Sequence, residues 1–418
     1  MIQLIRGFKD ILPEESALWQ HIENTARALF EDFGFREIHP PVLEKTELFK
    51  RSIGEDTDIV EKEMYTFADR NGDLITLRPE ATASVVRSYI QHKMYAVDPI
   101  RKMYTIGPMF RRERPQKGRY RQFYQINAEV FGEASPYIDA QLIFMLVTLF
   151  SKLGVMDINA HINSLGCPEC RPDFRKALSE LLISRKEQLC EDCIRRSERN
   201  PLRVLDCKVP ACREAVSEAP SIMDFLCPDC ARHFDTVQAM LVKQGVRFEL
   251  DKRLVRGLDY YTRTTFELQT GALGAQSAVA GGGRYDGLVK ALGGPAHPAI
   301  GFAIGFDRLV EIVSQSQENL EKKPVIFIAA LGEEGIQNGY IWANELCLAG
   351  VPTEADFSGK SLKSLMKRAD RMGALFVLMV GESELKEGRV VLRDMKTKEQ
   401  HAFPVDKLTE TITNFLNR

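Results

Sequence analysis

The chain has 418 residues, of which 44% are hydrophobic and 27% charged, an ordinary composition for a globular protein of two or three domains. It begins without the features of a secretory signal peptide, and no apolar stretch approaches the ~20 residues that span a bilayer, so we expect a cytoplasmic protein with no membrane partner. The formal net charge is −2, so a nucleic-acid partner would have to be met by a local basic patch.

The first predicted elements are a helix and a mixed region. Apolar residues recur at helical spacing after Pro13, and Gly34 ends the run. The paired Pro40 and Pro41 exclude helix and favour an extended segment. The stretch LITLRPEATASVVRSYI then predicts a strand, a turn at Pro79 and a second helix.

The stretch KMYTIGPMFRRERPQKGRYRQFYQINAEVFG predicts two strands joined by a loop. On the second strand, alternate residues from Tyr124 to Val130 are apolar, and those from Gln125 to Glu129 are polar, so each set occupies one face. A half-exposed sheet is one explanation. The Arg, Gln and Glu on the polar face, around the small Gly107, favour a pocket instead.

The loop between these strands is strongly basic. From Arg111 to Arg121 it carries six basic side chains against one acidic one. Such a local excess predicts a phosphate-binding patch, and a solvated hairpin tip is the alternative.

Eight of the nine cysteines lie between Cys167 and Cys230, within a polar segment that we predict to be a helical inserted module over residues 167–245. Their close pairs (CPEC, CEDC, CKVPAC, CPDC) are typical of Cys₄ zinc sites, and a cytosolic chain favours metal over disulfides. We expect at least one structural zinc ion, and eight ligands allow two; reduced buried cysteines are the alternative. The candidate ligands are Cys167, Cys170, Cys190, Cys193, Cys207, Cys212, Cys227 and Cys230.

The second half of the chain returns to strands and then changes character. VRFELDKRLVRGLDYYTRTTFELQT predicts strands, AVAGGGRYDGL is glycine-rich, and AIGFAIGFDRLVEIV predicts a strand or turn that leads into a helix. The polar stretch Gln315–Pro324 predicts a linker. From residue 324 to 418, strands alternate with helices, which predicts a small separate α/β domain.

Five stretches, which the chain carries in the order that the family has, resemble a class II aminoacyl-tRNA synthetase, and in particular the bacterial-type histidyl-tRNA synthetases. FREIHPPVLEKTELF, FRRERPQKGRYRQFYQINAEVFG and GFAIGFDRL are similar to the three class motifs, and RGLDYYTRTTFE and AGGGRYDGL to stretches particular to the histidine enzymes. The resemblance covers nearly the whole chain. It implies an α+β fold: a catalytic domain over residues 1–320 on a mostly antiparallel sheet with helices, the cysteine-rich insertion within it, and an α/β anticodon-binding domain over residues 324–418.

The resemblance implies a histidine–tRNA ligase that is a homodimer. Such an enzyme joins histidine to ATP, releases pyrophosphate, and transfers the histidine to the 3′ end of histidine tRNA, with Mg²⁺ on the ATP phosphates. The chemistry agrees with the residues, because the enzyme must hold two anions together and stabilise the charge of the transition state. Arginine suits this task, being always charged and able to bind phosphate through two hydrogen bonds.

The resemblance also implies the roles of individual residues. Arg111 and Arg256 would act as catalytic cations on the α-phosphate, and Arg308 would bind the γ-phosphate. Glu113 would lie near the adenine, and Arg119 and Tyr120 near the ATP. Structural ion pairs are the alternative for the three arginines.

The substrate histidine would be held by a second group of residues. Glu80, Thr82 and Gln125 match positions that bind its α-amino end, Arg256 its carboxylate, and Glu129 and Tyr261 its ring, with Tyr260 and Tyr285 close by. We expect the three glycines before Tyr285 to make room for a small amino acid, since no Gly-Lys-Ser/Thr of a P-loop follows. Core packing is the alternative for Tyr260, and a strand-face charge for Glu129. Gln116 matches the position that reads the extra 5′ guanosine of histidine tRNA.

Two other functions compete with this one. A regulatory paralogue that senses histidine typically lacks the C-terminal domain and the arginine–tyrosine motif, both of which this chain contains. An RNA-binding module without activation chemistry would not need the substrate pocket.

Overall fold

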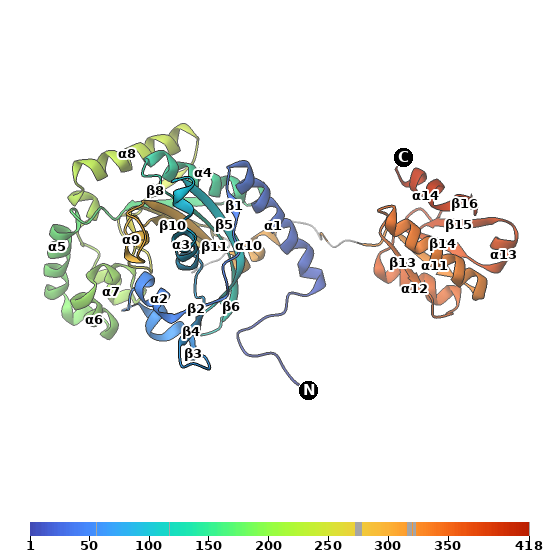
Figure 1. Ribbon diagram of the computed structural model, residues 1–418, viewed down its shortest axis with the longest axis horizontal. Helices are drawn as coiled ribbons and strands as arrows, with labels where there is room; N and C mark the ends of the chain where they lie inside the picture. The colour runs from blue at the N-terminus through green and yellow to red at the C-terminus, as the bar shows by residue number, and fades with distance from the viewer. Residues whose placement is uncertain (56, 117, 272–277, 316–319, 321–322, 418) are drawn as a thin grey trace. The chain divides into compact units, whose positions relative to one another are not determined.

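A computed structural model describes residues 1–55, 57–116, 118–271, 278–315, 320 and 323–417. The chain divides into two compact units, Met1–Leu320 and Glu321–Arg418, drawn in Figure 1. Most of the linker predicted over Gln315–Pro324 lies outside the described residues. None of the described helices is long and apolar enough to cross a membrane.

The first unit is built on an eight-stranded sheet with the order β1-β5-β6-β11-β10-β9-β7-β8. Its outermost pairs, β1 with β5 and β7 with β8, are parallel, and all the other neighbours are antiparallel. This confirms the predicted α+β fold with a mostly antiparallel sheet. The strands are β1 (Arg36–Glu37), β5 (Arg101–Phe110), β6 (Gln122–Phe131), β7 (Asn159–Ser164), β8 (Phe248–Leu250), β9 (Thr262–Gln269), β10 (Ala278–Arg284) and β11 (Ala299–Gly305).

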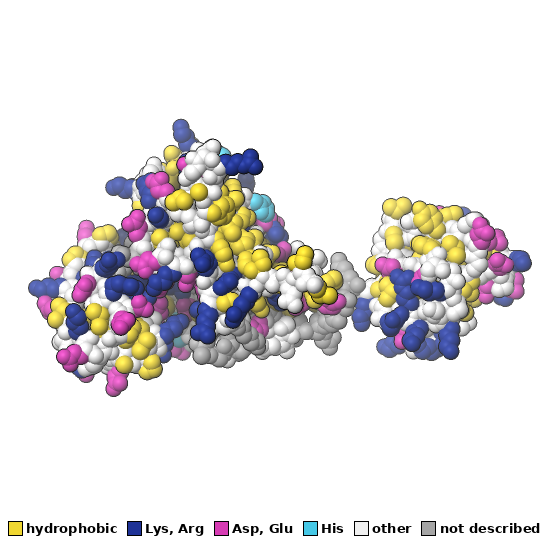
Figure 2. Space-filling model, turned by 90° about the horizontal axis from the view of Figure 1, so that it is seen from below, with side chains coloured by type: hydrophobic (Ala, Val, Ile, Leu, Met, Phe, Trp, Pro, Cys, Tyr) yellow, Lys and Arg dark blue, Asp and Glu magenta, His cyan; other side chains and the backbone are white. Residues whose placement is uncertain are grey.

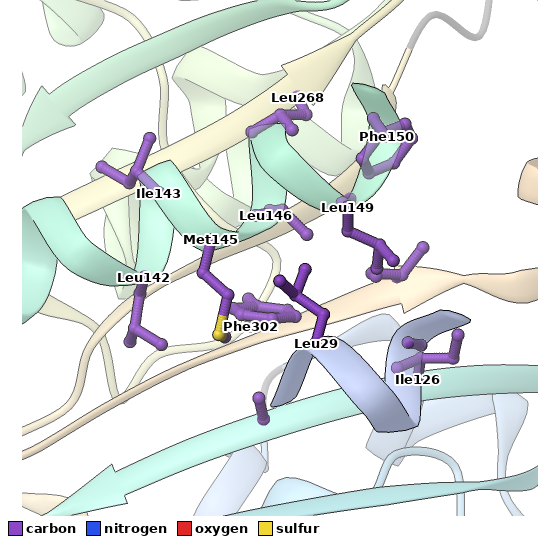
Figure 3. Close-up of a cluster of buried hydrophobic side chains, with 14 of the residues drawn as sticks. Leu29, Ile126, Leu142, Ile143, Met145, Leu146, Leu149, Phe150, Leu268 and Phe302 are labelled. Atoms are coloured by element: carbon purple, nitrogen blue, oxygen red, sulfur yellow. The ribbon is translucent and has the colours of Figure 1, made fainter. Parts of the chain in front are cut away.

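One face of this sheet is covered by helices that form the main core. Side chains of α4 pack together with those of α1 and the sheet, as Figure 3 shows for Leu146 of α4, Leu29 of α1 and Phe302 of β11. The apolar face predicted for β6, from Tyr124 to Val130, lies on this side. The covering helices are α1 (Pro13–Asp32), α4 (Pro136–Lys152), α8 (Pro228–Lys243) and α10 (Phe306–Val313).

Smaller elements pack beside the other, polar face. A three-stranded sheet with the order β2-β4-β3 contains β2 (Leu43–Lys45), β3 (Tyr65–Ala68) and β4 (Leu74–Leu77). With it lie α2 (Thr46–Ile53), a π-helical turn (Ile59–Glu63), α3 (Thr82–Gln91), a 3₁₀ turn (Met94–Ala96) and α9 (Leu288–Ala291). The strand, turn and helix predicted around Pro79 are therefore present as β4 and α3.

The cysteine-rich segment is helical, as predicted, and has a small core of its own. Phe174, Leu178 and Val204 are among its buried residues, and its helices lie on one side of the sheet in Figure 1. Its elements before α8 are α5 (Arg171–Ser184), α6 (Glu191–Arg199), α7 (Pro210–Ala215) and three 3₁₀ segments (Lys186–Gln188, Pro201–Asp206, Ile222–Phe225).

The second unit is an α/β sandwich around one buried strand. Alternate residues of β12 (Ile326–Ala330) face two separate apolar clusters, which explains why this strand is apolar on both faces. The sheet order is β13-β12-β14-β15-β16. The other elements are β13 (Thr353–Asp356), β14 (Phe376–Val380), β15 (Arg389–Asp394), β16 (Gln400–Pro404), α11 (Gly332–Leu348), α12 (Leu362–Met372), α13 (Glu382–Lys386) and α14 (Leu408–Leu416).

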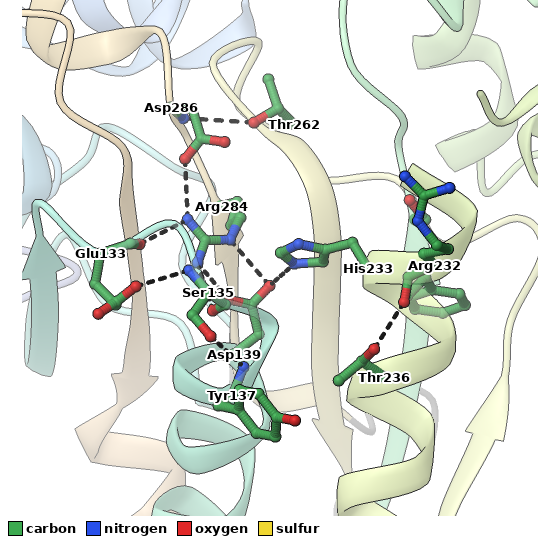
Figure 4. A network of polar contacts seen from close by, with 12 residues as sticks. Glu133, Ser135, Tyr137, Asp139, Arg232, His233, Thr236, Thr262, Arg284 and Asp286 are labelled. Atoms are coloured by element: carbon green, nitrogen blue, oxygen red, sulfur yellow. Dashed lines mark hydrogen bonds and ion pairs between the residues drawn. The ribbon is translucent and has the colours of Figure 1, made fainter. Parts of the chain in front are cut away.

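A buried ionic network joins β10 to helices α4 and α8 (Figure 4). Arg284 and Asp139 are both fully buried, and their closest nitrogen and oxygen atoms are 2.7 Å apart. Asp139 also bonds His233 of α8 at 2.8 Å, and Arg284 donates to the backbone carbonyls of Glu133 and Ser135 at 3.0 and 3.1 Å. The buried guanidinium is thus matched by acceptors on several sides, which buried charge requires.

We predict that Asp139→Asn destabilises the first unit by about 3–5 kcal/mol, because it removes the only fully buried counter-ion described for Arg284 and leaves the partly exposed Asp286, 3.1 Å away, as its acidic partner. Urea unfolding monitored by Trp19 fluorescence in a Trp342→Phe background would report on this unit alone, since the chain has two tryptophans. Arg232→Gln breaks an exposed ion pair with Asp229 on α8 and should cost at most about 1 kcal/mol. Equal losses in the two variants would contradict this assignment.

Candidate active site

The polar face of the β5–β6 hairpin forms the centre of the candidate site. Gln125 pairs with Gly107 across the two strands, and Glu129 pairs with Met103. The space above Gly107 holds Arg78, because a Cβ atom on Gly107 would lie 2.6 Å from its guanidinium. Arg78 is buried and donates hydrogen bonds to the carbonyls of Pro40 and Pro108, both at 2.9 Å. Gly107 therefore admits a structural arginine, which the sequence did not suggest.

A cavity of about 280 Å³ opens beside this face. It brings together the residues predicted to bind ATP with two of those predicted to bind histidine. Of the predicted residues, its lining includes Arg111, Glu113, Arg119, Tyr120, Gln125, Arg256 and Arg308.

Four arginines give this cavity its charge, and the protein fixes three of their side chains by hydrogen bonds. Arg111 donates to the carbonyl of Pro79 at 2.9 Å, and Arg308 to that of Ala278 at 2.6 Å. Arg256 donates to the Glu267 carboxylate at 2.6 Å. A cavity lined by fixed guanidinium groups suits a polyanion such as a triphosphate.

Glu113 lies between two of these cations. Its carboxylate is 3.7 Å from Arg111 and 3.2 Å from Arg119. Because Arg111 and Arg119 lie near the two ends of the hairpin loop, their ion pairs with Glu113 connect these ends.

Glu129 is the centre of a second, buried group. Its carboxylate accepts a hydrogen bond from the Thr82 hydroxyl at 2.6 Å and one from the Tyr285 hydroxyl. Burial raises the pKa of Glu129 to about 8, although both hydroxyl donors act to lower it. Burial likewise raises the pKa of Tyr285 well above its usual value. Burying an acid in this way costs free energy, and such groups cluster at functional sites, which makes Glu129 a candidate functional residue.

Glu80 lies at the start of α3 beside Thr82. Its two carboxylate oxygens accept from the backbone N–H groups of Thr82 and Ala83, at 2.6 and 3.0 Å. It is buried, and burial raises its pKa. The carboxylate therefore satisfies unpaired donors at a helix N-terminus and is held in one orientation.

Three tyrosines pack against one another beside Glu129. The ring of Tyr260 is 4.7 Å from that of Tyr261 and 5.5 Å, edge to face, from that of Tyr285. Tyr261 and Tyr285 are buried, and Tyr260 is half-buried. The ring of Tyr260 packs against two other side chains and is also partly exposed, so its position fits both core packing and a place in the wall of the pocket.

The glycine triplet lies within strand β10 and is not a loop. A Cβ atom on Gly281 would collide with the Arg256 guanidinium, so this glycine makes room for a protein side chain. Gly301, which pairs with Glu129 across β11 and β6, does the same for the Glu129 carboxylate. Both glycines thus let charged groups lie flat against the sheet.

One predicted site residue lies apart from the others. Gln116 is exposed on the hairpin loop, where its backbone pairs with Arg119, and it does not line the cavity. Its place suits contact with a large partner better than contact with ATP.

Sequence reasoning missed several residues of the site. Phe123 and Asn127 share the polar face of β6 by the same alternation that singled out Gln125 and Glu129, so strand position alone could have found them. Phe123 lines the cavity, and both side-chain polar atoms of Asn127 are buried without a hydrogen-bond partner among the described residues. Glu267, which accepts a hydrogen bond from Arg256, is the last residue of the motif RGLDYYTRTTFE, and nothing else in the sequence pointed to it.

The eight clustered cysteines form two groups of four, and Cys207 of the second group lines a neighbouring pocket together with Arg119 and Arg308. Each group offers four sulfur atoms, all within 4.8 Å of one another. The groups are Cys167, Cys170, Cys227 and Cys230, and Cys190, Cys193, Cys207 and Cys212. Sets of four thiols are the ligands that structural zinc prefers.

A mostly antiparallel sheet that carries an arginine-lined cavity between a basic hairpin and the start of a helix defines the class II aminoacyl-tRNA synthetases. Comparisons with known proteins narrow this class. A family model described as histidyl-tRNA synthetase matches residues 7–309, and one described as anticodon binding domain matches residues 325–415.

Individual relatives agree with the family models. The chain is 62% identical to a histidine–tRNA ligase of Desulforapulum autotrophicum, over 99% of each chain, and 63% identical to one of Desulfosudis oleivorans, over 97% of this chain and 96% of that one. The crystal structure of apo S. aureus histidyl-tRNA synthetase superimposes with a TM-score of 0.84 at 35% identity, covering 98% of this chain and 99% of that one. The chain belongs to the histidyl-tRNA synthetase family, and it is an enzyme with histidine–tRNA ligase activity.

We predict that Glu129 makes stability depend on pH. Its pKa is about 8 in the folded chain against 4.5 normally, so between these values the folded state holds a proton that the unfolded state has released. Stability therefore falls as pH rises through this window, by at most about 1.4 kcal/mol per pH unit. Thermal melting of the ligand-free protein from pH 5 to pH 8.5 should show a shallower fall for Glu129→Gln. Parallel profiles would contradict the assignment.

Proposed function

We propose that the arginine-lined cavity and the buried Glu129 group together perform the activation of histidine. A carboxylate oxygen of histidine attacks the α-phosphorus of ATP, the bond to the β-phosphate breaks, and pyrophosphate leaves. A ribose hydroxyl at the 3′ end of histidine tRNA then attacks the carbonyl carbon, and AMP leaves. The observation that carries this proposal is that one strand, β6, bears Gln125 in the cavity and the buried Glu129 four residues further on.

The arginines would hold the anions of both substrates. We assign Arg111 and Arg256 to the α-phosphate, Arg256 also to the histidine carboxylate, and Arg308 to the γ-phosphate. Arg111 directly follows β5, Arg256 lies in the segment before β9, and Arg308 is on α10; each is fixed by a protein acceptor. Fixed donors favour the transition state because they need no reorganisation as charge develops.

Glu129 would select the imidazole ring of histidine. A carboxylate on one ring nitrogen and the hydroxyl of Tyr261 on the other fix both the position and the tautomer of the ring. Tyr260 and Tyr285 would enclose it. An apolar amino acid would leave Glu129 buried without its partner, which is a large penalty.

The α-amino group would lie at the N-terminus of α3. Glu80, Thr82 and Gln125 offer it oxygen acceptors. The side-chain amide oxygen of Gln125 (Oε1) is buried and has no hydrogen-bond partner among the described residues. Glu80 keeps lone pairs beyond those used by the helix backbone. A substrate ammonium group would match these acceptors in charge and geometry.

The adenine would lie against Phe123, near Glu113, with Arg119 and Tyr120 closing over the ATP. Mg²⁺ binds phosphate and carboxylate oxygens and would neutralise charge on the triphosphate. Of the described residues that line the cavity, Glu113, Glu267 and Asp307 carry carboxylates.

Recognition of histidine tRNA would involve both units. We assign Gln116 on the exposed hairpin to the acceptor end, within a catalytic domain of residues 1–320, and the anticodon to a domain of residues 324–418. Figure 2 shows Lys and Arg side chains gathered on the visible face of this second unit. Lys363, Lys367 and Arg371 are exposed at helical spacing on α12, a basic stripe that suits a phosphate backbone.

We further propose a cytoplasmic homodimer with at least one structural zinc in the inserted module of residues 167–245. The half-exposed Leu43, on the first class motif, and Phe67 pair with Leu77 and Ile75 of β4 and so share one face of the three-stranded sheet, which gives it an apolar surface that a partner subunit would cover. The two cysteine groups support the zinc.

Amino-acid-dependent exchange of pyrophosphate into ATP tests the proposed function. Histidine alone, among the standard amino acids, should support exchange. If no amino acid does so, or if another serves equally well, the assignment of the pocket is wrong.

We predict that Arg256→Ala lowers the exchange rate by about 10²- to 10³-fold, because a fixed cation is removed from the transition state. Histidine binding, measured by calorimetry, should remain detectable, since the ring contacts are kept. Arg393→Ala in the second unit is the matched control and should exchange normally. Near-normal exchange by Arg256→Ala would reject its catalytic role.

A further inference from the structure

The two cysteine groups are distinct tetrads with a nested pairing. The first tetrad joins the first and last cysteine pairs of the module, and the second tetrad joins the two middle pairs. In the first, Cys167 Sγ is 3.6 Å from Cys170 Sγ and 3.9 Å from Cys227 Sγ. In the second, Cys190 Sγ is 4.0 Å from Cys207 Sγ. Four sulfurs at ~2.3 Å from one tetrahedral zinc ion lie ~3.8 Å apart, so both sets have the spacing of zinc ligands.

The inserted module also needs such cross-links. Its apolar core is small, and the module is built from helices and short 3₁₀ segments. Modules of this size rarely gain enough stability from apolar burial alone and are commonly held by a metal or by disulfides. All eight cysteines are free thiols, so metal is the cross-link that the chemistry offers.

We propose that each tetrad binds one zinc ion, and that the ion of the first tetrad positions the segment Asp259–Arg263, whose Tyr260 and Tyr261 read histidine. The second part rests on the proposed function of that segment. The loop of the first tetrad, Leu165–Cys170, connects β7 to α5 and lies against the start of β9.

Backbone hydrogen bonds join this loop to Arg263. The Leu165 N–H donates to the Arg263 carbonyl at 2.6 Å, and the Arg263 N–H donates to the Gly166 carbonyl at 2.9 Å. Arg263 has φ +49°, a left-handed conformation that side-chain-bearing residues rarely adopt. The tetrad loop therefore holds a strained residue two positions after Tyr261.

Arg171 makes a second connection. It follows the ligand Cys170 directly, and its guanidinium donates to the backbone carbonyl of Tyr261 and, at 3.3 Å, to that of Leu165. Gly166 has φ +60°, and a Cβ atom there would lie 2.6 Å from the Cys170 Cβ. The backbone of this loop therefore lies directly against the ligand Cys170, and only glycine fits at position 166.

The second tetrad reaches the same segment from another side. Between its ligands Cys193 and Cys207, Asn200 and Arg203 donate to the Asp259 carboxylate at 2.9 and 3.1 Å. Asp259 immediately precedes Tyr260. The histidine-reading segment is thus held by residues adjoining both metal sites, whereas Arg111 and Arg308 lie on other elements. Loss of the first tetrad's ion should therefore weaken histidine binding and spare the ATP contacts made by Arg111 and Arg308.

Metal content tests the two sites directly. The full-length protein purified without chelator should contain two zinc ions per chain by elemental mass spectrometry. Cys227→Ser and Cys207→Ser should each contain one, and the control Cys347→Ser, on α11, should contain two. Less than half an equivalent in the unaltered protein would overturn the metal sites, and loss of both ions in either single variant would overturn their independence.

Kinetics test the positioning role. In pyrophosphate exchange, Cys227→Ser should raise the KM for histidine on the order of ten- to a hundredfold and leave the KM for ATP unchanged. Arg171→Ala keeps all eight ligands, so it should retain two zinc ions and show the same rise in the histidine KM. This variant tests the positioning role even if Cys227→Ser fails to fold. An unchanged histidine KM in Arg171→Ala would overturn the positioning role. Histidine-dependent exchange by the unaltered protein separates this outcome from a failure of the proposed function.

Discussion

A carboxylate buried in the middle of the sheet is the constraint on which the site depends. Glu129 cannot be solvated there, and burial raises its pKa to about 8. The surrounding residues are those that such an acid requires: hydroxyl donors from Thr82 and Tyr285, and the absence of a side chain on Gly301 opposite it. The carboxylate lone pairs that these two hydroxyl groups leave unused can accept hydrogen bonds from a ligand with N–H donors, and imidazole is such a ligand.

Strand β10 connects this acid to the rest of the site. Gly281 at its centre leaves room for Arg256, Arg284 at its end enters the buried network of α4 and α8, and Tyr285 just beyond reaches Glu129. The Arg284–Asp139 pair therefore fixes the position of Tyr285 as well as the stability of the core. A strand with three consecutive glycines would otherwise be weak, because glycine gains little from packing.

Much of this could be predicted from the sequence, because it follows from local patterns. Alternation along β6 separated the core residues from Gln125 and Glu129, and the family motifs indicated the fold and the arginines. The space above Gly107 was misread, since Arg78, which fills it, comes from a distant segment. The same alternation places Phe123 and Asn127 on this face, but neither residue was predicted to belong to the site, since Phe123 is apolar and no role was assigned to Asn127.

The pairing of the cysteines lay beyond any local pattern. Spacing identified four pairs, but which pairs share a site depends on the return of α8 to the end of β7, a tertiary contact. The same holds for Arg171 and Arg203, whose partners Tyr261 and Asp259 are more than fifty residues away. Such contacts link the inserted module to the histidine-reading segment, and they give the module a role beyond its own stability.

Histidine binding to Glu129→Leu, measured by calorimetry beside ATP binding to the same variant, tests the central claim most directly. If Glu129 reads the imidazole ring, histidine affinity falls about a hundredfold or more, and ATP affinity is unchanged. A variant that binds histidine as tightly as the unaltered protein would show that the buried carboxylate is structural and that other residues select the substrate.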